Sequence, residues 1–247
     1  MARRHPFNPR AVTTTDTPPQ NQLLARLPAT VLKRLLAQAH LVPLHLGERL
    51  CEEGAVLPGA WFPVGGFVSL LISTPEHPSL ELGMAGPEGC LGATLALGAD
   101  TAATSGLVQG AGHAWWVKAP ALRLQLRQQP TLAAVLHRYL FVQMLQAGQA
   151  AACLRFHLIE PRLARWLLMT QDRAGRDAFT VTHSFLASML GVRRVGVTLA
   201  AQALQGRGLI HYQRGHLQVL DRPGLLAAAC SCYARQRQAY VSQWPGP

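Results

Sequence analysis

Apolar residues recur at helical spacing in two short, adjacent segments between residues 182 and 205. Their apolar faces consist of Phe185, Leu186, Met189 and Leu190 in the first segment and of Val197, Ala200, Ala201 and Leu204 in the second. Gly191 separates the segments, and glycine accepts the left-handed backbone that ends a helix at a sharp turn. The pattern therefore predicts two short helices joined by a tight turn, the arrangement of a helix-turn-helix.

Two runs of alternating residues follow the second helical segment. Residues 209–213 and 216–221 are predicted to be short strands, with Arg214-Gly215 as the turn between them. A hairpin in this position is typical of a wing, and its tip would bring Arg214 and His216 close to a DNA phosphate. A plain surface hairpin would give the same pattern, so the hairpin supports a winged domain only together with the two helices.

Upstream of the two predicted helices, the pattern of apolar and polar residues along the chain changes twice. Residues 1–20 are rich in Thr, Pro and Arg without periodicity, which predicts a disordered tail. Residues 21–40 have apolar positions at helical spacing. From residue 41 to 117, short apolar runs alternate with Gly and Pro, which predicts the short strands of a small β sandwich or barrel.

A long helix is predicted from residue 131 to about 156, with only Arg138 and Arg155 as Lys or Arg charges. Its apolar residues cover much more than one face, which exceeds what a single domain needs. We therefore expect the helix to pair with its copy in a second chain, and burial within one subunit is the alternative. The expected dimer contacts are Leu132, Leu136, Tyr139, Leu140 and Met144.

The net charge of +11 is concentrated in the last third of the chain, where residues 156–247 contain eleven Arg and four acidic residues. Such a distribution is typical of nucleic-acid binding. Arg193 and Arg194 open the second helix of the pair, where positive charge opposes the helix dipole, so we expect them to meet an anion or a guanine. Thr198 lies one turn further along. Solvation of an exposed helix start is the alternative explanation.

Several classes of protein are disfavoured by composition. The chain start lacks the apolar core of a signal peptide, no stretch of about 20 uncharged apolar residues exists, and the five cysteines are mostly far apart. A reducing cytoplasm without membrane contact is the expected location. Cys230-Ser231-Cys232 has no second pair in sequence, so we interpret it as structural and expect no metal or cofactor. No catalytic motif is present, and we expect no enzyme.

The order of these elements resembles the Crp/Fnr superfamily of bacterial transcription regulators. The resemblance covers about residues 21–233 and is strongest around Thr182, Ala187, Gly191 and Gly208-Leu209-Ile210. It implies an α+β fold with three parts after the tail. These are a β-roll of the cyclic-nucleotide-binding type over 21–130, a dimerisation helix over 131–156 and a winged helix-turn-helix over 157–247.

The resemblance implies a homodimer that reads a palindromic site in double-stranded DNA, with RNA polymerase as a further partner. The expected DNA contacts are Thr182, His183, Ser184, Arg193, Arg194, Val195, Thr198, Arg214 and His216. Well-studied members begin the recognition helix with Arg-Glu and carry a second Arg four residues after the Glu. Here Arg194 matches the first Arg, but Val195 and Leu199 occupy the other two places, so the operator of those members cannot be carried over.

The β-roll departs from the pattern that holds a cyclic nucleotide. Family members use a Gly-Glu turn and an Arg-Ser/Thr pair, whereas this chain has Gly89-Cys90 and the run 99–104 without arginine. Lys118 is the only Lys or Arg between residues 50 and 122, so a buried phosphate would lack a charged partner. Cyclic-nucleotide binding is therefore not expected, although glycine-rich backbone amides could form an anion nest. The effector stays unknown.

Other sensing chemistries receive little support from the sequence. The N-terminal region lacks the closely spaced cysteines of an iron–sulfur site. Haem binding through His45, His77 or His113 is left open, and Cys51, Cys90 and Cys153 are expected to be inert, since no cationic neighbour adjoins them in sequence. The competing hypothesis is a small-molecule-sensing allosteric protein, open to cyclic nucleotides, whose winged domain contacts proteins and not DNA.

Overall fold

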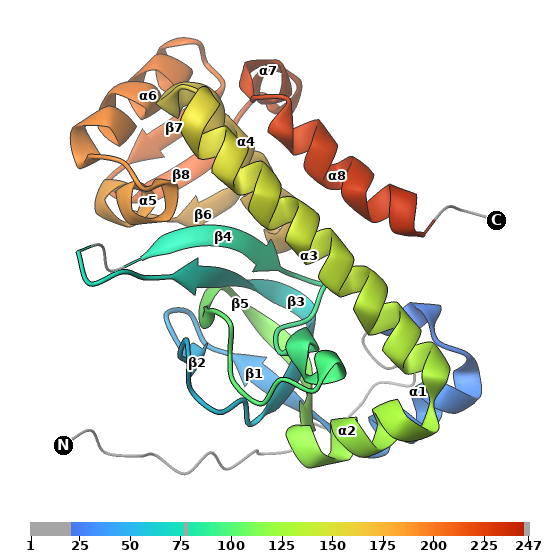
Figure 1. Ribbon diagram of the computed structural model, residues 1–247. Coiled ribbons are helices and arrows are strands. Elements are labelled where there is room, and N and C mark those ends of the chain that lie inside the picture. Colours follow the sequence, from blue (N-terminus) through green and yellow to red (C-terminus); the bar gives the residue numbers. More distant parts are fainter. Residues whose placement is uncertain (1–20, 77–78, 245–247) are drawn as a thin grey trace.

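The computed structural model describes residues 21–76 and 79–244, and Figure 1 shows two domains connected by one long helix. The predicted disordered tail, residues 1–20, lies outside the described residues. The N-terminal domain comprises the 3-10 turns η1 (Leu24–Arg26) and η2 (Ala93–Leu97), helices α1 (Ala29–Leu36) and α2 (Ala119–Gln128), and strands β1 (Ala39–Leu44), β2 (Arg49–Cys51), β3 (Gly59–Ile72), β4 (Leu80–Ala85) and β5 (Ser105–Lys118).

The strands of the N-terminal domain form one antiparallel sheet in the order β1-β5-β3-β4, and β2 pairs with β5. The long strands β3 and β5 pair along most of their length, with shifts in register between Pro63 and Val68. Gly112 lies at this irregular stretch, where a Cβ atom would come within 2.1 Å of the Gly65 carbonyl oxygen. The absence of a side chain therefore lets the two strands approach and the sheet curve. The predicted β-roll is confirmed.

Helix α3 (Pro130–Phe156) is the long helix predicted from the sequence, and it runs along the front of the molecule in Figure 1. Its inner face packs into the core of the N-terminal domain through Leu132, Leu136 and Tyr139, all 0% exposed within one chain. These three residues were predicted to contact a second chain, and the structure contradicts that assignment because the protomer already buries them. Leu140 is half-buried, and Met144 is 62% exposed.

The C-terminal domain is a winged helix-turn-helix. Its elements are α4 (Ile159–Ala174), β6 (Ala178–Thr180), α5 (His183–Leu190), α6 (Arg194–Gly206), β7 (Ile210–Gln213), β8 (His216–Val219) and α7 (Arg222–Ala228). The three strands form a small antiparallel sheet in the order β6-β8-β7. Its core contains the apolar residues that define the predicted helical faces, including Leu186, Val197 and Leu204.

The chain then returns to the long helix. Helix α8 (Cys232–Gln243) leaves the winged domain and lies alongside α3, as Figure 1 shows at the right of the molecule. At its far end Tyr240 and Trp244 pack against the core of the N-terminal domain. The guanidinium of Arg26 lies 4.7 Å from the Trp244 ring, a cation–π distance. The last helix therefore contacts both domains.

Across the described residues, no single helix has both the length and the apolar composition needed to cross a membrane. Helices α5 and α6 meet that criterion only when taken together as a pair bent by 107°.

Candidate nucleic-acid interface

Helix α5 begins with a side-chain cap. Thr182 has an extended backbone, and its Oγ1 accepts a hydrogen bond from the Phe185 amide at 3.1 Å. This is the standard N-cap geometry, which satisfies one of the free amides at a helix start. Thr182 is exposed, but its hydroxyl is already used to position the helix. Ser184 is exposed beside it on the first turn.

The turn between α5 and α6 is made by Gly191, which has φ +59° and ψ 44°. The Val192 amide bonds to the Ala187 carbonyl at 3.0 Å, the six-to-one hydrogen bond of a glycine-ended helix. Arg162 of α4, which is 7% exposed, donates to the Leu190 carbonyl at the end of α5. The two helices meet at 107°, within the range of DNA-binding helix-turn-helix motifs. The sequence prediction of this motif is confirmed.

The first turns of α6 present an outward surface of mixed character. Arg193 and Arg194 are exposed, and no side chain caps this helix start. Val195 and Leu199, which replace the polar residues of well-studied members, are 62% and 61% exposed. Apolar side chains on a recognition helix can contact the methyl group of thymine. Leu199 was not among the predicted contacts, although its apolar type at a helical repeat from Val195 was a usable signal.

Two of the predicted DNA contacts also brace the domain internally. Thr198 Oγ1 lies 3.1 Å from the Arg194 carbonyl and 3.0 Å from His183 Nδ1. The His183 ring stacks on Tyr212 with centroids 4.4 Å apart. Burial and the nearby positive charge of Arg194 lower the pKa of His183, so the ring is neutral. His183 and Thr198 therefore join α5, α6 and the wing, and we assign them a positioning role.

Tyr212 is the residue of this brace that the sequence did not single out. Its hydroxyl donates to the Val181 carbonyl at 2.9 Å, and its amide donates to Gln205 Oε1 at 2.6 Å. Burial raises the pKa of Tyr212, so the hydroxyl stays protonated and remains a donor. Tyr212 thus attaches the wing to the start of α5 through its side chain and to α6 through its backbone amide.

The tip of the wing is a two-residue turn. Arg214 has φ +49° and Gly215 has φ +83°, the two positive values of the hairpin turn that matches strand twist. Among the described residues other than glycine, Arg214 alone has positive φ, a conformation that disfavours a long side chain. Arg214 and His216 are exposed at the tip, as predicted.

Replacing Arg214 with Asn is expected to separate folding from binding. Asn adopts positive φ more readily than Arg, so the free energy of unfolding should rise by about 0.5–1 kcal/mol. Loss of one phosphate contact should at the same time weaken DNA binding. The slope of the logarithm of the binding constant against the logarithm of the salt concentration should become shallower by about one. Denaturant titration and binding at several salt concentrations would measure both effects. An unchanged salt dependence would show that Arg214 does not contact a phosphate.

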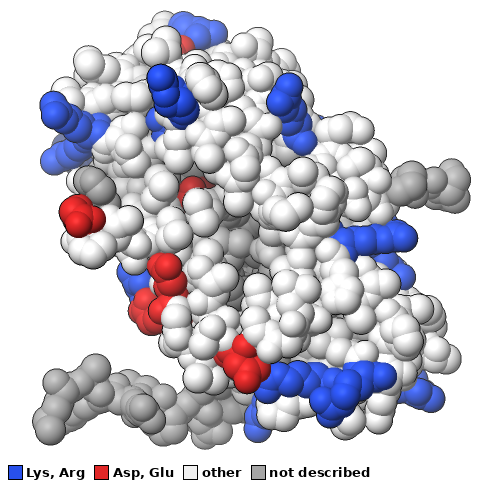
Figure 2. All heavy atoms as spheres, in the orientation of Figure 1, with Lys and Arg blue, Asp and Glu red and all other residues white. Residues whose placement is uncertain are grey.

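Arginines on this surface differ in whether they have an acidic partner. Arg207 is paired with Glu160 at 2.8 Å, and Arg222 is paired with Asp172 at 2.6 Å. No ion pair between described residues involves Arg193, Arg194 or Arg214. In Figure 2 the charged residues on the winged domain, at the top of the view, are mainly Lys and Arg, whereas most acidic residues lie lower, over the β-roll. Three exposed, unneutralised guanidinium groups are thus available to an anionic partner.

The β-roll contains a separate cavity of about 260 Å³ beneath α3. Part of the segments predicted to correspond to the cyclic-nucleotide site lines it, namely Cys90 together with Ala102, Ala103 and Thr104, whereas Gly89 and residues 99–101 do not. From α3 it receives Leu140, Met144 and two Gln side chains. No described residue that lines this cavity is charged. His45 and His113 are exposed and do not line it, and His77 lies outside the described residues.

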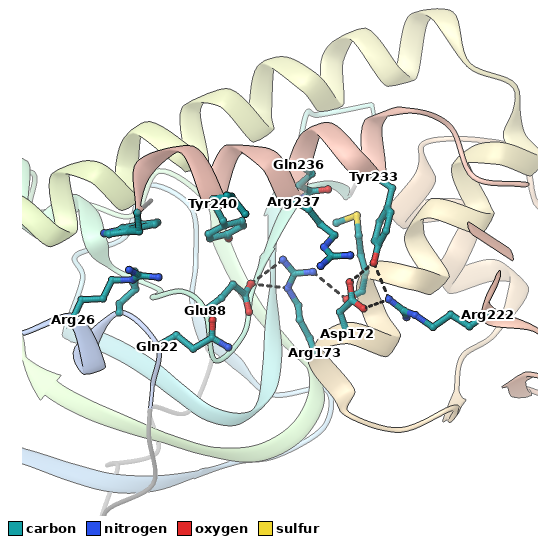
Figure 3. Close-up of a pocket in the computed structure, with 14 residues that line it drawn as sticks. Gln22, Arg26, Glu88, Asp172, Arg173, Arg222, Tyr233, Gln236, Arg237 and Tyr240 are labelled. Atoms are coloured by element: carbon teal, nitrogen blue, oxygen red, sulfur yellow. Dashed lines mark hydrogen bonds and ion pairs between the residues drawn. The ribbon is translucent and has the colours of Figure 1, made fainter. Parts of the chain in front are cut away.

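A buried ion pair joins the two domains, as Figure 3 shows. Arg173 of α4 binds Glu88 of the β-roll through Nε and Nη2, each 2.8 Å from Oε1. The Arg173 side chain is 7% exposed, and its Nη1 also donates to the Met169 carbonyl at 3.0 Å. Burial alone would lower the pKa of Arg173, but the Glu88 carboxylate raises it above its usual value. Glu88 adjoins the Gly89-Cys90 turn of the cavity.

One interpretation from the sequence needs correction. The sequence predicts that Cys230 and Cys232 form a pair without further metal ligands. The structure places Cys153 and His157 beside them, and the ligand atoms of the four residues all lie within 4.8 Å of one another. The prediction missed this group because the two halves are 77 residues apart in sequence. Cys51 and Cys90 are buried and unpaired elsewhere in the chain.

Comparison with known proteins bears directly on the winged domain. The family model described as the Crp-like helix-turn-helix domain matches residues 161–228. The chain carries a Crp-like helix-turn-helix domain. The match spans α4 to α7, so it includes the turn at Gly191 and the arginines of α6 and the wing.

Solved structures extend the similarity beyond the Crp-like domain, to 78% of the chain in each of three cases. FixK2 from Bradyrhizobium japonicum is 15% identical with a TM-score of 0.66, covering 78% of this chain and 98% of that chain. CLP of Xanthomonas campestris is 20% identical (TM-score 0.64, coverage 78% and 99%), and a Crp/Fnr-family regulator from Thermus thermophilus is 23% identical (0.60, 78% and 99%). At these identities the similarity establishes the Crp/Fnr fold. No curated protein matches the chain.

Proposed function

We propose that the protein is a sequence-specific, DNA-binding transcription regulator of the Crp/Fnr type. The observation that carries the proposal is a group of exposed arginines without an ion-pair partner on the helix-turn-helix and the wing: Arg193 and Arg194 at the start of α6 and Arg214 at the tip of the wing. Helix α6 would lie in the major groove with its N-terminal turns against base edges, while the wing contacts the backbone. Contact with RNA polymerase remains an expectation.

The sequence preference would combine one polar and two apolar contacts. Arg194 has the geometry to bind guanine through two hydrogen bonds, and Val195 and Leu199 would pack against thymine methyl groups. Family members with Glu and Arg at these two positions read their sites through polar groups. We therefore propose an operator half-site that contains guanine next to thymine-rich positions and differs from theirs.

We further propose that two chains pair through the outer face of α3. The exposed residues of this helix recur at alternating spacings of three and four, the pattern of a coiled-coil seam. The seam consists of Ala134, His137, Phe141, Met144, Gly148 and Ala151. Phe141 and Met144 are 42% and 62% exposed at its centre, and the small residues Gly148 and Ala151 on the C-terminal side would permit close approach. A dimer with two recognition helices would bind a palindromic site.

The effector of this regulator is proposed to be uncharged or absent. The β-roll cavity is lined by apolar, thiol, hydroxyl and amide side chains without a charged group, so the phosphate of a cyclic nucleotide would be buried without a cation. The Xanthomonas regulator CLP is described as responsive to c-di-GMP, a doubly anionic ligand. The same lack of cations argues that this chain does not share that response. An apolar molecule of a size that fits about 260 Å³ suits the cavity better.

The first test of the proposed function is Arg194→Ala. The purified protein, without added effector, should enrich a common palindrome from genomic fragments, and the variant should lose about 1–3 kcal/mol of affinity for that site. Its affinity for bulk nonspecific DNA should fall less, because the remaining arginines still neutralise phosphates.

Binding at two salt concentrations separates the alternatives. Equal losses on all sequences would mean that Arg194 contacts phosphate and does not read a base. Weak binding that is insensitive to salt would contradict DNA recognition, and would favour the competing hypothesis that the winged domain contacts another protein.

A further inference from the structure

Four side chains that bind soft divalent metals converge where the two domains join. Cys153 lies in the last turn of α3, His157 follows the end of that helix, and Cys230 and Cys232 flank the start of α8. Their ligand atoms all lie within 4.8 Å of one another. The three cysteines are 1%, 8% and 0% exposed, and His157 is half-buried.

The local backbone brings these ligands into one place. Cys153 and His157 are four residues apart at the end of a helix, so their side chains project to the same side. The Cys230 amide donates to the Pro161 carbonyl at 3.3 Å, which fixes the two-cysteine segment against the start of α4. Helix α8 begins at Cys232, directly after this contact.

The spacing of the ligand atoms fits a single tetrahedral ion. Cys153 Sγ lies 3.6 Å from Cys230 Sγ, and Cys232 Sγ lies 3.4 Å from His157 Nδ1. Zinc–sulfur bonds of about 2.3 Å and zinc–nitrogen bonds of about 2.0 Å give tetrahedral edges of about 3.5–3.8 Å. Two of the donor pairs are thus held at nearly the separation that bound zinc requires, and the remaining pairs lie within 4.8 Å.

We propose that Cys153, His157, Cys230 and Cys232 form a structural zinc site. Four protein ligands close the coordination sphere and leave no open position for substrate, which is typical of a structural and not a catalytic zinc. Donors that all surround one point suit a single ion, whereas a two-iron cluster needs ligands divided between two metals. A disulfide between Cys153 and Cys230 would leave Cys232 and His157 without a role.

The surroundings of the site provide the support that metal ligands need. The Gln149 amide donates to Cys232 Sγ at 2.9 Å, the kind of outer hydrogen bond that orients a thiolate ligand. Arg162 and Arg165 line the same small cavity as Cys153. Three thiolates and one Zn²⁺ carry a net charge of about −1, which these arginines would balance.

The bound ion would connect three segments that are otherwise held together by individual hydrogen bonds and by packing. It would join the end of α3, the two-residue link before α4 and the start of α8. The winged domain would then be held at a fixed angle to the long helix. Zinc binding should therefore raise the thermal stability of the protein whatever its role on DNA, because metal affinity adds to folding free energy.

The test uses the full-length protein, purified under reducing conditions and stripped with a chelator. Titration with Zn²⁺ should reach one equivalent per chain and raise the melting temperature. Titration with Co²⁺ should produce thiolate-to-metal charge-transfer absorption and the visible bands of a tetrahedral site. His157→Ala should weaken zinc affinity by more than about tenfold, since it removes a ligand outright. Cys51→Ser, which removes a buried thiol in the β-roll, should retain one full equivalent.

Three results would overturn the zinc site. These are zinc binding below about a tenth of an equivalent by the wild-type chain, Co²⁺ spectra without thiolate absorption, or equal metal loss in Cys51→Ser and His157→Ala. Purified protein that holds iron and sulfide in place of zinc would also contradict it. The wild-type Co²⁺ spectrum decides the matter even if a cysteine variant fails to fold.

Discussion

Replacing Glu88 with Ala should lower the free energy of unfolding by about 3–5 kcal/mol, the usual loss when one partner of a buried ion pair is removed. The Arg173 guanidinium would stay buried with the Met169 carbonyl as its remaining partner. Because Glu88 belongs to the β-roll and Arg173 to the winged domain, the damage should fall on the contact between the domains. Thermal or denaturant unfolding of the full chain would measure it.

Two variants show whether the charge or the contact matters in this ion pair. Glu88→Gln keeps an acceptor for Arg173 and should lose less stability than Glu88→Ala. The double variant Glu88→Ala with Arg173→Met removes the unpaired charge and should recover part of the loss. A loss below about 1 kcal/mol in Glu88→Ala would mean that water reaches Arg173 and that the pair behaves like a surface salt bridge.

Replacing both Phe141 and Met144 with Glu should convert the proposed dimer into monomers. Each chain would contribute two carboxylates to a closely packed apolar seam, so the dimer would carry four unpaired charges. Burying such groups weakens association by several kcal/mol, or at least about 100-fold in the dissociation constant. Sedimentation velocity at micromolar concentration would detect the change, and affinity for a palindromic site should fall with it.

Two comparisons test whether the seam residues themselves hold the dimer together. Leu124→Glu changes an exposed leucine on α2, 40% exposed, and should leave the dimer intact. Leu136→Glu introduces a charge into the protomer core and should destabilise folding itself. A dimer that survives the double change at Phe141 and Met144 would contradict the proposed seam.

The helix-turn-helix was predictable from sequence because its determinants are local. The apolar spacing around Leu186 and Val197 specifies each helix, and Gly191 supplies the one left-handed residue that the turn requires. The wing was predictable for the same reason, because its two strands and its turn are specified by neighbouring residues. Local patterns do not, however, reveal which hydroxyl is free. The sequence predicts that Thr198 contacts DNA, and the structure adds that its hydroxyl has two partners inside the domain, His183 and the Arg194 carbonyl.

The dimer face was harder to predict because α3 is apolar on both sides. One side fills the protomer core through Tyr139, and the opposite side exposes Phe141. Periodicity alone cannot say which side faces the β-roll. The cysteine cluster could not be predicted because its two halves are far apart in sequence. It forms only where the start of α8 packs against the end of α3, and Cys230 is 77 residues after Cys153. The sequence of α8 does not by itself predict that this helix packs against α3.

The return of α8 has a consequence for how the regulator would be controlled. A winged domain attached only through residues 157 and 158 could swing freely, but α8 ties it to α3 and, through Trp244 and Arg26, to the N-terminal domain. In the proposed dimer, the position of each recognition helix relative to α3 of its own chain would then be fixed before any effector binds. Any change in that position would have to break the contacts of α8 with α3 together with the ion pair between Arg173 and Glu88.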